Sequence, residues 1–319
     1  MKIVILDGFV ANPGDLTWSE WAALGEFTVY DRTEGKDVVE RARGAEVVLT
    51  NKTILTQEII ESLPSLRYIG VLATGYNVVD LVAARRRGIV VTNIPAYSTA
   101  SVTQLVLAHL LNIANGVADY TAAVAGGAWQ TSTDFCFYRQ PQMELCGKTL
   151  GIVGVGNIGR AVAQVAIALG MRVVALSSKT VSELQEMGIE KAETLESLFR
   201  ESDVVSLHCP LTDETHHLIN RQSLAWMKPS AILINTGRGP LIDEEALAEA
   251  LNEGRLYAVG LDVLSQEPPR QGSPLIGAHN CHITPHIAWA TPEARQRLIT
   301  IAMQNVKAFL DGKPQNVIG

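Results

Sequence analysis

GVGNIG, residues 154–159, matches the pattern G-x-G-x-x-G. A short apolar run, 150–153, precedes it, and residues 158–169 follow with apolar side chains at helical spacing. A strand, a glycine-rich turn and a helix in this order predict the first βα unit of a dinucleotide-binding fold, whose helix N-terminus attracts phosphates. The alternative is a glycine turn with a purely structural role. The residues predicted to bind the cofactor here are Gly154, Gly156, Asn157, Ile158 and Gly159.

The residues that follow the next expected strand, 172–176, indicate which cofactor binds. An Asp or Glu about 20 residues after the glycines selects NAD, because it bonds the ribose and repels a 2′-phosphate. Here Ser177, Ser178 and Lys179 occupy this place, and two hydroxyls and an ammonium can bind such a phosphate. We therefore predict NADP(H) as the favoured cofactor and NAD(H) as the second candidate. The alternative is a solvated loop whose side chains contact nothing.

Length and composition narrow the class of protein. The chain has 319 residues, enough for about two domains, and 47% of them are hydrophobic. A net charge of −7 argues against nucleic-acid and anionic-membrane partners. Its 4 cysteines show no C-x-x-C spacing, which indicates reduced thiols and no metal site. With an early charged residue and no apolar run of membrane-spanning length, the sequence predicts a cytoplasmic protein.

Strand and helix patterns alternate over residues 1–98 and again over 148–285, with a long helix expected over 101–120 between them. This alternation predicts the α/β class, with two doubly wound parallel-sheet domains and a cleft between them as the small-molecule site. The expected strands are 2–6, 27–30, 47–49, 68–72 and 90–92 in the first domain, and 150–153, 172–176, 204–207, 231–234, 258–261 and 282–284 in the second.

Two loops of the first domain follow expected strands. They are 50–53, which includes Asn51 and Lys52, and 73–77, which begins Ala73-Thr74-Gly75. Ligands of open α/β sheets bind beyond the carboxyl ends of strands, so we expect the N–H groups of both loops to be available for an anion. The alternative is a pair of ordinary polar connections.

Three charged residues near the ends of expected strands can carry hydride-transfer chemistry on a 2-keto acid. Arg238 can bind the carboxylate and carbonyl with its planar fork. His286 can donate the proton to the carbonyl oxygen, and Glu267 can orient it and favour its charged form. Taken singly, an Arg after a strand is often a surface ion pair, and a Pro-His turn is often only a turn. Asp262 can bond the nicotinamide amide or cap the next turn.

The chain resembles the D-isomer-specific 2-hydroxyacid dehydrogenases, and most of all their glycerate dehydrogenase and hydroxypyruvate or glyoxylate reductase branch. The motifs that carry this resemblance span nearly the whole chain: VLTNKT, VLATGYNVVD, IPAYSTASVTQLVLA, GVGNIGRAVAQ, MKPSAILINTGRGPLID, GLDVLSQEPP and ITPHIAW. The resemblance implies a homodimer with a flavodoxin-like substrate domain, residues 1–100 and 287–319, and an inserted Rossmann domain, residues 101–286. Residues around 129–138 would form a dimer arm.

The resemblance also implies roles for individual residues. Arg238, Glu267 and His286 would be the catalytic trio. The residues implied at the substrate are Asn51, Lys52, Ala73, Thr74, Gly75 and Trp289, and further residues expected at the cofactor are Cys209, Pro210, Thr236 and Asp262. Ser177 stands where NAD-dependent members commonly have Asp, which places an NAD preference in doubt.

These observations favour an oxidoreductase that reduces a small 2-keto acid, hydroxypyruvate or glyoxylate, by hydride transfer from a nicotinamide. Two alternatives stay open. The same chemistry can act on a bulkier 2-keto acid, or the fold can serve a nucleotide-sensing protein without catalysis. The presence of Arg238, Glu267 and His286 together argues for the enzyme, since a sensor has no need of all three.

Overall fold

The structure is a computed structural model and describes residues 1–318. The chain divides into two compact units. Unit 1 comprises Met1–Ser98 and Trp289–Gly319, and unit 2 comprises Thr99–Ala288. The roles expected for these units, substrate binding and nucleotide binding, remain predictions.

Unit 1 contains a five-stranded sheet in the order β2-β1-β3-β4-β5, with every pair parallel. This is the flavodoxin-like order, which confirms the predicted fold class for this unit. Its elements are β1 (Lys2–Ile5), η1 (Ser19–Leu24), β2 (Glu26–Val29), η2 (Gly35–Asp37), α1 (Val38–Arg41), β3 (Val47–Thr50), α2 (Gln57–Glu61), β4 (Tyr68–Val71), α3 (Leu81–Arg86), β5 (Val90–Thr92) and α11 (Pro292–Leu310).

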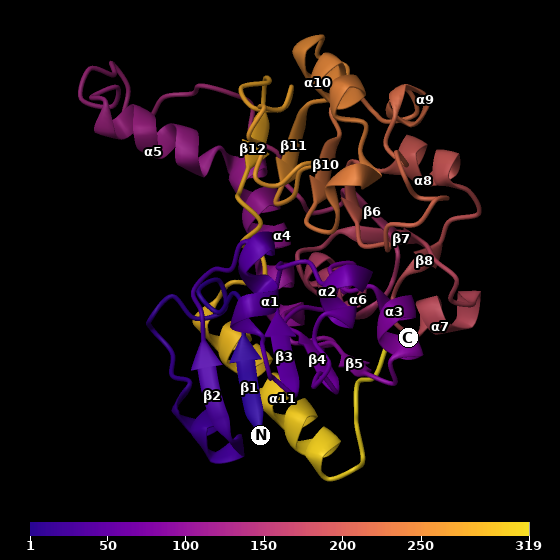
Figure 1. The fold of residues 1–319 in the computed structure, drawn as a ribbon. Coiled ribbons are helices and arrows are strands. Elements are labelled where there is room, and N and C mark those ends of the chain that lie inside the picture. Colours follow the sequence, from indigo (N-terminus) through magenta and orange to yellow (C-terminus); the bar gives the residue numbers. More distant parts are fainter. Residues whose placement is uncertain (319) are drawn as a thin grey trace. The chain divides into compact units, whose positions relative to one another are not determined.

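Helices cover both faces of this sheet because its central strands are apolar on both sides, as parallel strands generally are. One face packs against α1, α2 and α3 through Val38, Ile60 and Ala83. The other packs against α11, the last helix of the chain, through Leu298 and Ala302 (Figure 1). The helix at the end of the sequence therefore completes the core of the unit that contains the first residues.

Unit 2 contains a seven-stranded sheet in the order β12-β11-β10-β9-β6-β7-β8, again with every pair parallel. This is the Rossmann order with one added strand. Its elements are α4 (Thr99–Asn115), α5 (Val117–Ala125), β6 (Thr149–Val153), α6 (Asn157–Ala168), β7 (Arg172–Leu176), α7 (Val181–Gln185), β8 (Glu190–Lys191), α8 (Leu195–Glu201), β9 (Val204–Leu207), α9 (Arg221–Leu224), β10 (Ile232–Asn235), η3 (Gly239–Leu241), α10 (Glu244–Asn252), β11 (Ala258–Leu261) and β12 (Cys281–Ile283).

Two hydrophobic cores lie on the two faces of this second sheet. The helices α4, α6 and α7 supply Val106, Val162 and Leu184 to one of them. The helices α8 and α10 supply Phe199 and Leu247 to the other. Helix α5 has no buried residue and projects away from the sheet of its own unit, as Figure 1 shows.

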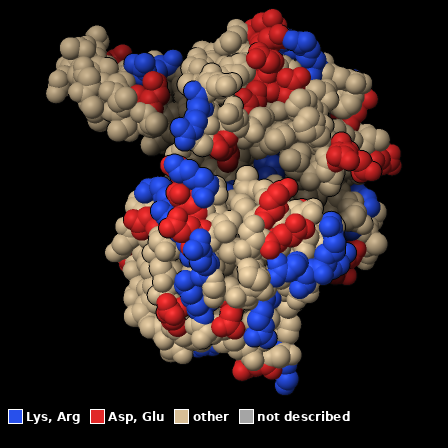
Figure 2. Space-filling model, in the orientation of Figure 1, with Lys and Arg blue, Asp and Glu red and all other residues tan. Residues whose placement is uncertain are grey.

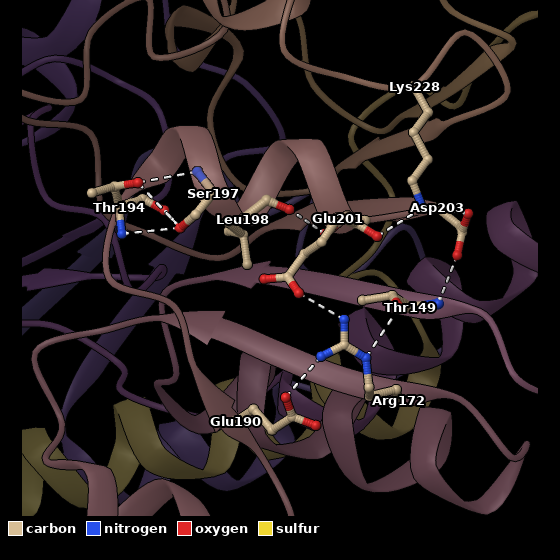
Figure 3. A network of polar contacts seen from close by, with 10 residues as sticks. Thr149, Arg172, Glu190, Thr194, Ser197, Leu198, Glu201, Asp203 and Lys228 are labelled. Carbon is tan, nitrogen blue, oxygen red and sulfur yellow. Dashed lines mark hydrogen bonds and ion pairs between the residues drawn. The ribbon is translucent and has the colours of Figure 1, made fainter.

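A polar network joins the amino ends of the strands of unit 2 (Figure 3). Arg172, the first residue of β7, contacts Glu190 and Glu201 at 2.7 Å each. Asp203, just before β9, accepts hydrogen bonds from the backbone N–H of Thr149 and from Nζ of Lys228, each at 2.9 Å. The strands are thus tied together at the edge opposite to the one where the predicted site residues follow them.

One local prediction needs correction, and two short elements were missed. The helix expected over 101–120 ends at Asn115, because Gly116 adopts a left-handed conformation with φ of 65° and α5 continues at an angle of 59°. The short strand β8 and helix α7 were not predicted, since two paired residues and a five-residue helix carry too little pattern. The bounds of the expected strands differ from the observed ones by at most one residue at either end.

Acidic and basic side chains are interspersed on the face that Figure 2 shows. Among the described residues, no single helix is long and apolar enough to cross a membrane. Within residues 1–318, the bent pair α4 and α5 reaches that length and composition when the two helices are taken together.

Two glycines of the quoted motif provide a matched test of the fold. A Cβ on Gly159 would lie 2.2 Å from the carbonyl oxygen of Gly154, whereas a Cβ on Gly156 would meet nothing within 4 Å. We expect Gly159→Ala to lower the free energy of unfolding by more than about 2 kcal/mol, because backbone must move. Gly156→Ala should change it by less than about 0.5 kcal/mol. Urea unfolding followed by circular dichroism measures both, and equal losses would contradict the packing described here.

Candidate active site

The predicted residues of unit 2 follow the carboxyl ends of its parallel strands. The turn 154–159 follows β6, Ser177 follows β7 and Cys209 lies two residues after β9. Arg238 follows β10, and Asp262 follows β11 directly. The register pairs Asn235 with Leu261 and Leu261 with Ile283, so the last residues of β10, β11 and β12 lie side by side. Parallel pairing therefore gathers these residues at one edge of the sheet.

The glycine turn has the geometry that a phosphate needs. Gly154 has φ of 94°, and its Cβ position would lie 2.8 Å from the backbone nitrogen of Cys209. The turn thus packs directly on the segment after β9. Gly156 begins α6 as an N-cap without any side-chain cap, and the space beside its Cα is open. The first N–H groups of α6 are left for an anion, since no side chain of the turn satisfies them.

Ser177, Ser178 and Lys179 form the loop after β7. The hydroxyl of Ser177 accepts a hydrogen bond from the backbone N–H of Lys179 at 3.2 Å. The ammonium of Lys179 lies 3.7 Å from a carboxylate oxygen of Glu183, and Nζ of Lys191 donates to the carbonyl of Lys179 at 2.6 Å. Lys191 on β8 is a second cation at this loop that the sequence alone did not indicate, because β8 itself was not predicted.

The other residues expected at the cofactor differ in what they touch. The hydroxyl of Thr236 is buried and has no hydrogen-bond partner among the described residues. Buried polar groups are normally hydrogen-bonded, so this hydroxyl is a candidate to bond a ligand. Burial raises the pKa of the Cys209 thiol, so Cys209 suits a wall better than a nucleophile. Pro210 is exposed beside it. Asp262 has no exposed surface, and its carboxylate accepts the backbone N–H groups of Ile287 and Ala288 after β12, a role that neither expectation for it included. A direct contact of Asp262 with the nicotinamide stays a prediction.

His286 and Glu267 are in direct contact. Nδ1 of His286 lies 2.6 Å from Oε2 of Glu267, and the other oxygen of Glu267 accepts the backbone N–H of Leu264 at 3.0 Å. The carboxylate can only accept, so the proton lies on Nδ1 and Nε2 is the ring atom left to face a substrate. The two side chains are 29% and 32% exposed, which leaves them within reach of a small molecule.

Arg238 is joined to this pair through the backbone. Its neighbour Gly239 packs so closely on the loop after β11 that a Cβ there would lie 2.0 Å from the carbonyl carbon of Leu264. Leu264 is the residue that holds Glu267. Within residues 1–318 the Arg238 guanidinium makes no ion pair, and its contact is with the carbonyl of Gly237 at 2.8 Å. The exposed fork therefore remains available for an anion.

Asn235, the buried last residue of β10, holds the Arg238 loop. Its side-chain amide donates to the carbonyl of Arg238 at 2.8 Å and accepts the N–H of Gly237 at 3.0 Å. Sequence reasoning missed this residue, although a polar side chain at the end of an apolar strand is the signal that could have revealed it.

In unit 1 the two expected anion loops behave differently. The N–H groups of Asn51, Lys52 and Thr53 donate to the carboxylate of Asp7 at 2.7, 2.6 and 2.8 Å. The prediction that these N–H groups are available for a ligand is therefore wrong, because a buried side chain already binds them. Asp7, two residues after β1, was missed by sequence reasoning.

The side chains at these loops remain candidates for substrate contact. Oδ1 of Asn51 is buried without a partner, and Lys52 is exposed. The backbone N–H groups of Ala73, Thr74 and Gly75 donate to no acceptor within residues 1–318, which leaves this loop as the one with free donors. The ring of Trp289 lies 6.4 Å from that of Tyr97.

A polar cavity of about 380 Å³ in unit 2 lies at the amino end of β12, and its lining includes Asn112, Arg139 and His282. None of the predicted site residues lines it. Within the part of the chain that the structure describes, no cluster of three or more His, Cys, Asp or Glu side chains is arranged to hold a metal ion.

Comparison with known proteins identifies the family. Residues 107–288 match the D-isomer specific 2-hydroxyacid dehydrogenase, NAD binding domain. A hydroxypyruvate reductase of Blautia hydrogenotrophica is 48% identical, over 100% of this chain and 99% of that protein. A glycerate dehydrogenase of Methylorubrum extorquens is 40% identical, over 99% and 98%. The solved TT0316 protein from Thermus thermophilus has a TM-score of 0.86 at 36% identity and covers 100% of both chains.

The chain belongs to the D-isomer-specific 2-hydroxyacid dehydrogenase family. It is an oxidoreductase with a nicotinamide-binding Rossmann domain, and the enzyme class and fold expected from the sequence are confirmed. Relatives named hydroxypyruvate reductase, glycerate dehydrogenase and glyoxylate reductase agree with activity on small 2-hydroxy and 2-keto acids.

The burial of His208, just after β9, predicts that the protein loses stability in acid. Burial lowers the pKa of His208 from 6.5 to about 4, so as the pH falls this histidine is protonated in the unfolded chain before it is protonated in the folded one. Stability from this group is complete above about pH 6.5 and falls as the pH drops from there to below 4, by about 3 kcal/mol in total. His208→Gln should flatten the dependence of unfolding free energy on pH in this window, measured by urea unfolding without cofactor. An unchanged slope would contradict the assignment.

Proposed function

We propose that this protein reduces hydroxypyruvate or glyoxylate to the D-2-hydroxy acid, with NADPH favoured over NADH. The observation that carries the proposal is the contact of 2.6 Å between His286 and Glu267, with the Arg238 loop packed on the loop that holds Glu267. The names of the curated relatives support the substrate class, since they include hydroxypyruvate and glyoxylate reductases.

The residues of unit 2 fit a dinucleotide. The uncapped start of α6 and the open space at Gly156 suit a pyrophosphate, and the unpartnered hydroxyl of Thr236 suits a further polar contact. When bound, the reduced nicotinamide supplies a hydride to the carbonyl carbon of the substrate. Ser177, Ser178 and Lys179 would bind the 2′-phosphate of the adenosine ribose, and Lys191 adds a positive charge beside them.

His286 is the proposed proton donor. With Nδ1 directed to Glu267, Nε2 delivers its proton to the substrate oxygen as the carbonyl becomes an alcohol. Glu267 acts by fixing the orientation of the imidazole ring. Arg238 binds the carboxylate and carbonyl oxygens, which orients the keto acid and stabilises negative charge on its oxygen.

The free N–H groups of Ala73, Thr74 and Gly75 are proposed to bind the substrate carboxylate. The side chains of Asn51, Lys52 and Trp289 are the further candidates for substrate contact. A small substrate, with few groups beyond the carboxylate and carbonyl, is what this set of donors can satisfy.

A homodimer is part of the proposal. Three aromatic side chains in the segment after α5 are exposed: Trp129 by 55%, Phe135 by 90% and Tyr138 by 84%. An apolar groove on α4 and α6 lies in the same unit, with Leu107, Leu111 and Val165 among its lining residues. Exposed apolar surfaces of this kind mark contacts with another protein, and a second copy of this chain is the partner proposed.

Replacement of the proton donor tests the reaction. His286→Ala should lower kcat for hydroxypyruvate with NADPH by about 10²–10⁴-fold and leave the Kd for NADPH unchanged within about twofold. Oxidation of the reduced nicotinamide, followed by absorbance with hydroxypyruvate, glyoxylate, pyruvate and phenylpyruvate, measures it.

His279→Ala serves as the matched control, because His279 is exposed in the same unit and should keep full activity. Faster turnover of phenylpyruvate than of the small acids would redirect the proposal to a bulkier substrate. An inactive wild-type protein that still binds NADPH would favour the nucleotide-sensing alternative.

The cofactor preference has its own test. Ser177→Asp should raise the ratio of kcat/KM for NADH over NADPH by at least about tenfold, because a carboxylate bonds the ribose and repels a 2′-phosphate. Ser182→Asp adds the same charge on the exposed side of α7 and should leave the ratio unchanged. A wild-type enzyme that already prefers NADH would refute the cofactor assignment and retain the reaction.

A further inference from the structure

His109 is a buried histidine on α4 with a polar partner in the sheet. It is 6% exposed, on a helix face otherwise formed by apolar residues such as Val106 and Ile113. Its Nε2 lies 3.0 Å from Oγ1 of Thr284, just after β12. The sheet makes room for it, because a Cβ on Gly260 would lie 2.8 Å from the Cβ of His109.

The hydrogen bonds that link His109, Thr284 and Asp262 all have the same donor direction, from His109 toward Asp262. Oγ1 of Thr284 lies 2.6 Å from Oδ1 of Asp262, and a carboxylate only accepts, so the hydroxyl proton points to Asp262. The contact of Thr284 with the carbonyl of Leu261, at 3.3 Å, is longer and has a neutral acceptor. Nε2 of His109 must then donate to Thr284, which places the ring proton on Nε2. The chain of donors ends on Asp262.

His109 keeps this role because it stays neutral. Burial lowers its pKa, against an opposing effect of the Asp262 charge and with a small further lowering from His282. A neutral ring with its proton on Nε2 has a lone pair on Nδ1, so it needs no second acceptor in the apolar interior.

Asp262 holds the backbone next to the proposed proton donor. Its oxygens accept the N–H groups of Ile287 at 2.9 Å and Ala288 at 2.8 Å, and the carbonyl of Ala288 accepts the hydroxyl of Ser101 on α4 at 2.6 Å. The residue before Ile287 is His286, whose φ of 55° lies in the left-handed region that non-glycine residues rarely adopt. Such a conformation persists where surrounding bonds impose it.

We propose that His109 is a positioning residue for His286, acting through Thr284 and Asp262. The relay orients the Asp262 carboxylate, the carboxylate holds the backbone of 287 and 288, and this backbone keeps His286 in the left-handed conformation from which its ring meets Glu267. The inference rests on the proposed function of His286 as proton donor. Bonds in such a chain polarise one another, so its members are expected to act as a unit.

Four variants test the relay in the full-length enzyme, with hydroxypyruvate and NADPH. His109→Leu removes the bond to Thr284, and Thr284→Val removes that bond together with the bond to Asp262. Each should lower kcat by about tenfold, with the KM for hydroxypyruvate changed less than about twofold. The kcat of the double variant, His109→Leu with Thr284→Val, should be no lower than that of the poorer single variant, because either substitution alone already interrupts the relay. His109→Gln retains an N–H donor and should recover activity to within about twofold of wild type.

A control separates positioning from packing. Val106→Ala removes buried volume from the same helix and should lower stability without a change in kcat. Additive losses in the double variant, or equal losses in His109→Gln and His109→Leu, would overturn the relay and leave only a packing role for His109.

A spectroscopic measurement tests the relay apart from the reaction. Nitrogen-15 spectra of histidine-labelled protein should show His109 with its proton on Nε2, and Thr284→Val should remove the protection of that proton. A proton on Nδ1 would refute the relay. A wild-type protein that reduces no keto acid with either cofactor would refute the proposed function instead, and the spectra would still decide whether the relay exists.

Discussion

Parallel pairing of every strand in the seven-stranded sheet determines where the chemistry of unit 2 can lie. Because all strands run in one direction, their carboxyl ends meet at one edge, and the loops that follow them come together there. The charged residues Arg172, Glu190 and Glu201 join strands at the opposite edge, where they stabilise without blocking a ligand. The ion pairs that join the strands and the candidate site residues thus lie at opposite ends of the same strands.

A buried aspartate after a strand organises a loop in each unit. Asp7 accepts three backbone N–H groups from the loop after β3, and Asp262 accepts two backbone N–H groups and a hydroxyl from the segment after β12. A buried carboxylate is tolerated only where donors replace its water, so each one imposes a single arrangement on the backbone that supplies them. In unit 2 this arrangement includes His286, and the proposed relay extends the constraint to α4.

Several features of the site were predictable because they depend on local pattern. The turn 154–159 requires glycines for reasons of backbone geometry, and the observed φ of Gly154 and the close approach of Gly159 to it agree with that requirement. The start of α10 is local in the same way, because the side chain of Asp243 just before the helix accepts the N–H of Ala246. The end of α4 was misjudged, since a single glycine in an apolar helical pattern does not reveal by itself whether it interrupts the helix.

The sequence by itself determined the family, the two parallel α/β sheets and the candidates Arg238, Glu267 and His286, because strand periodicity, turn glycines and these motifs are local properties of the chain. Only the tertiary structure decided which of these groups meet. Glu267 reaches His286 across 19 residues, Asp262 binds the backbone 25 and 26 residues further on, and His109 lies 175 residues from Thr284. These contacts depend on the register of the strands and on the burial of a charged group. Neither can be recognised from a short stretch of sequence.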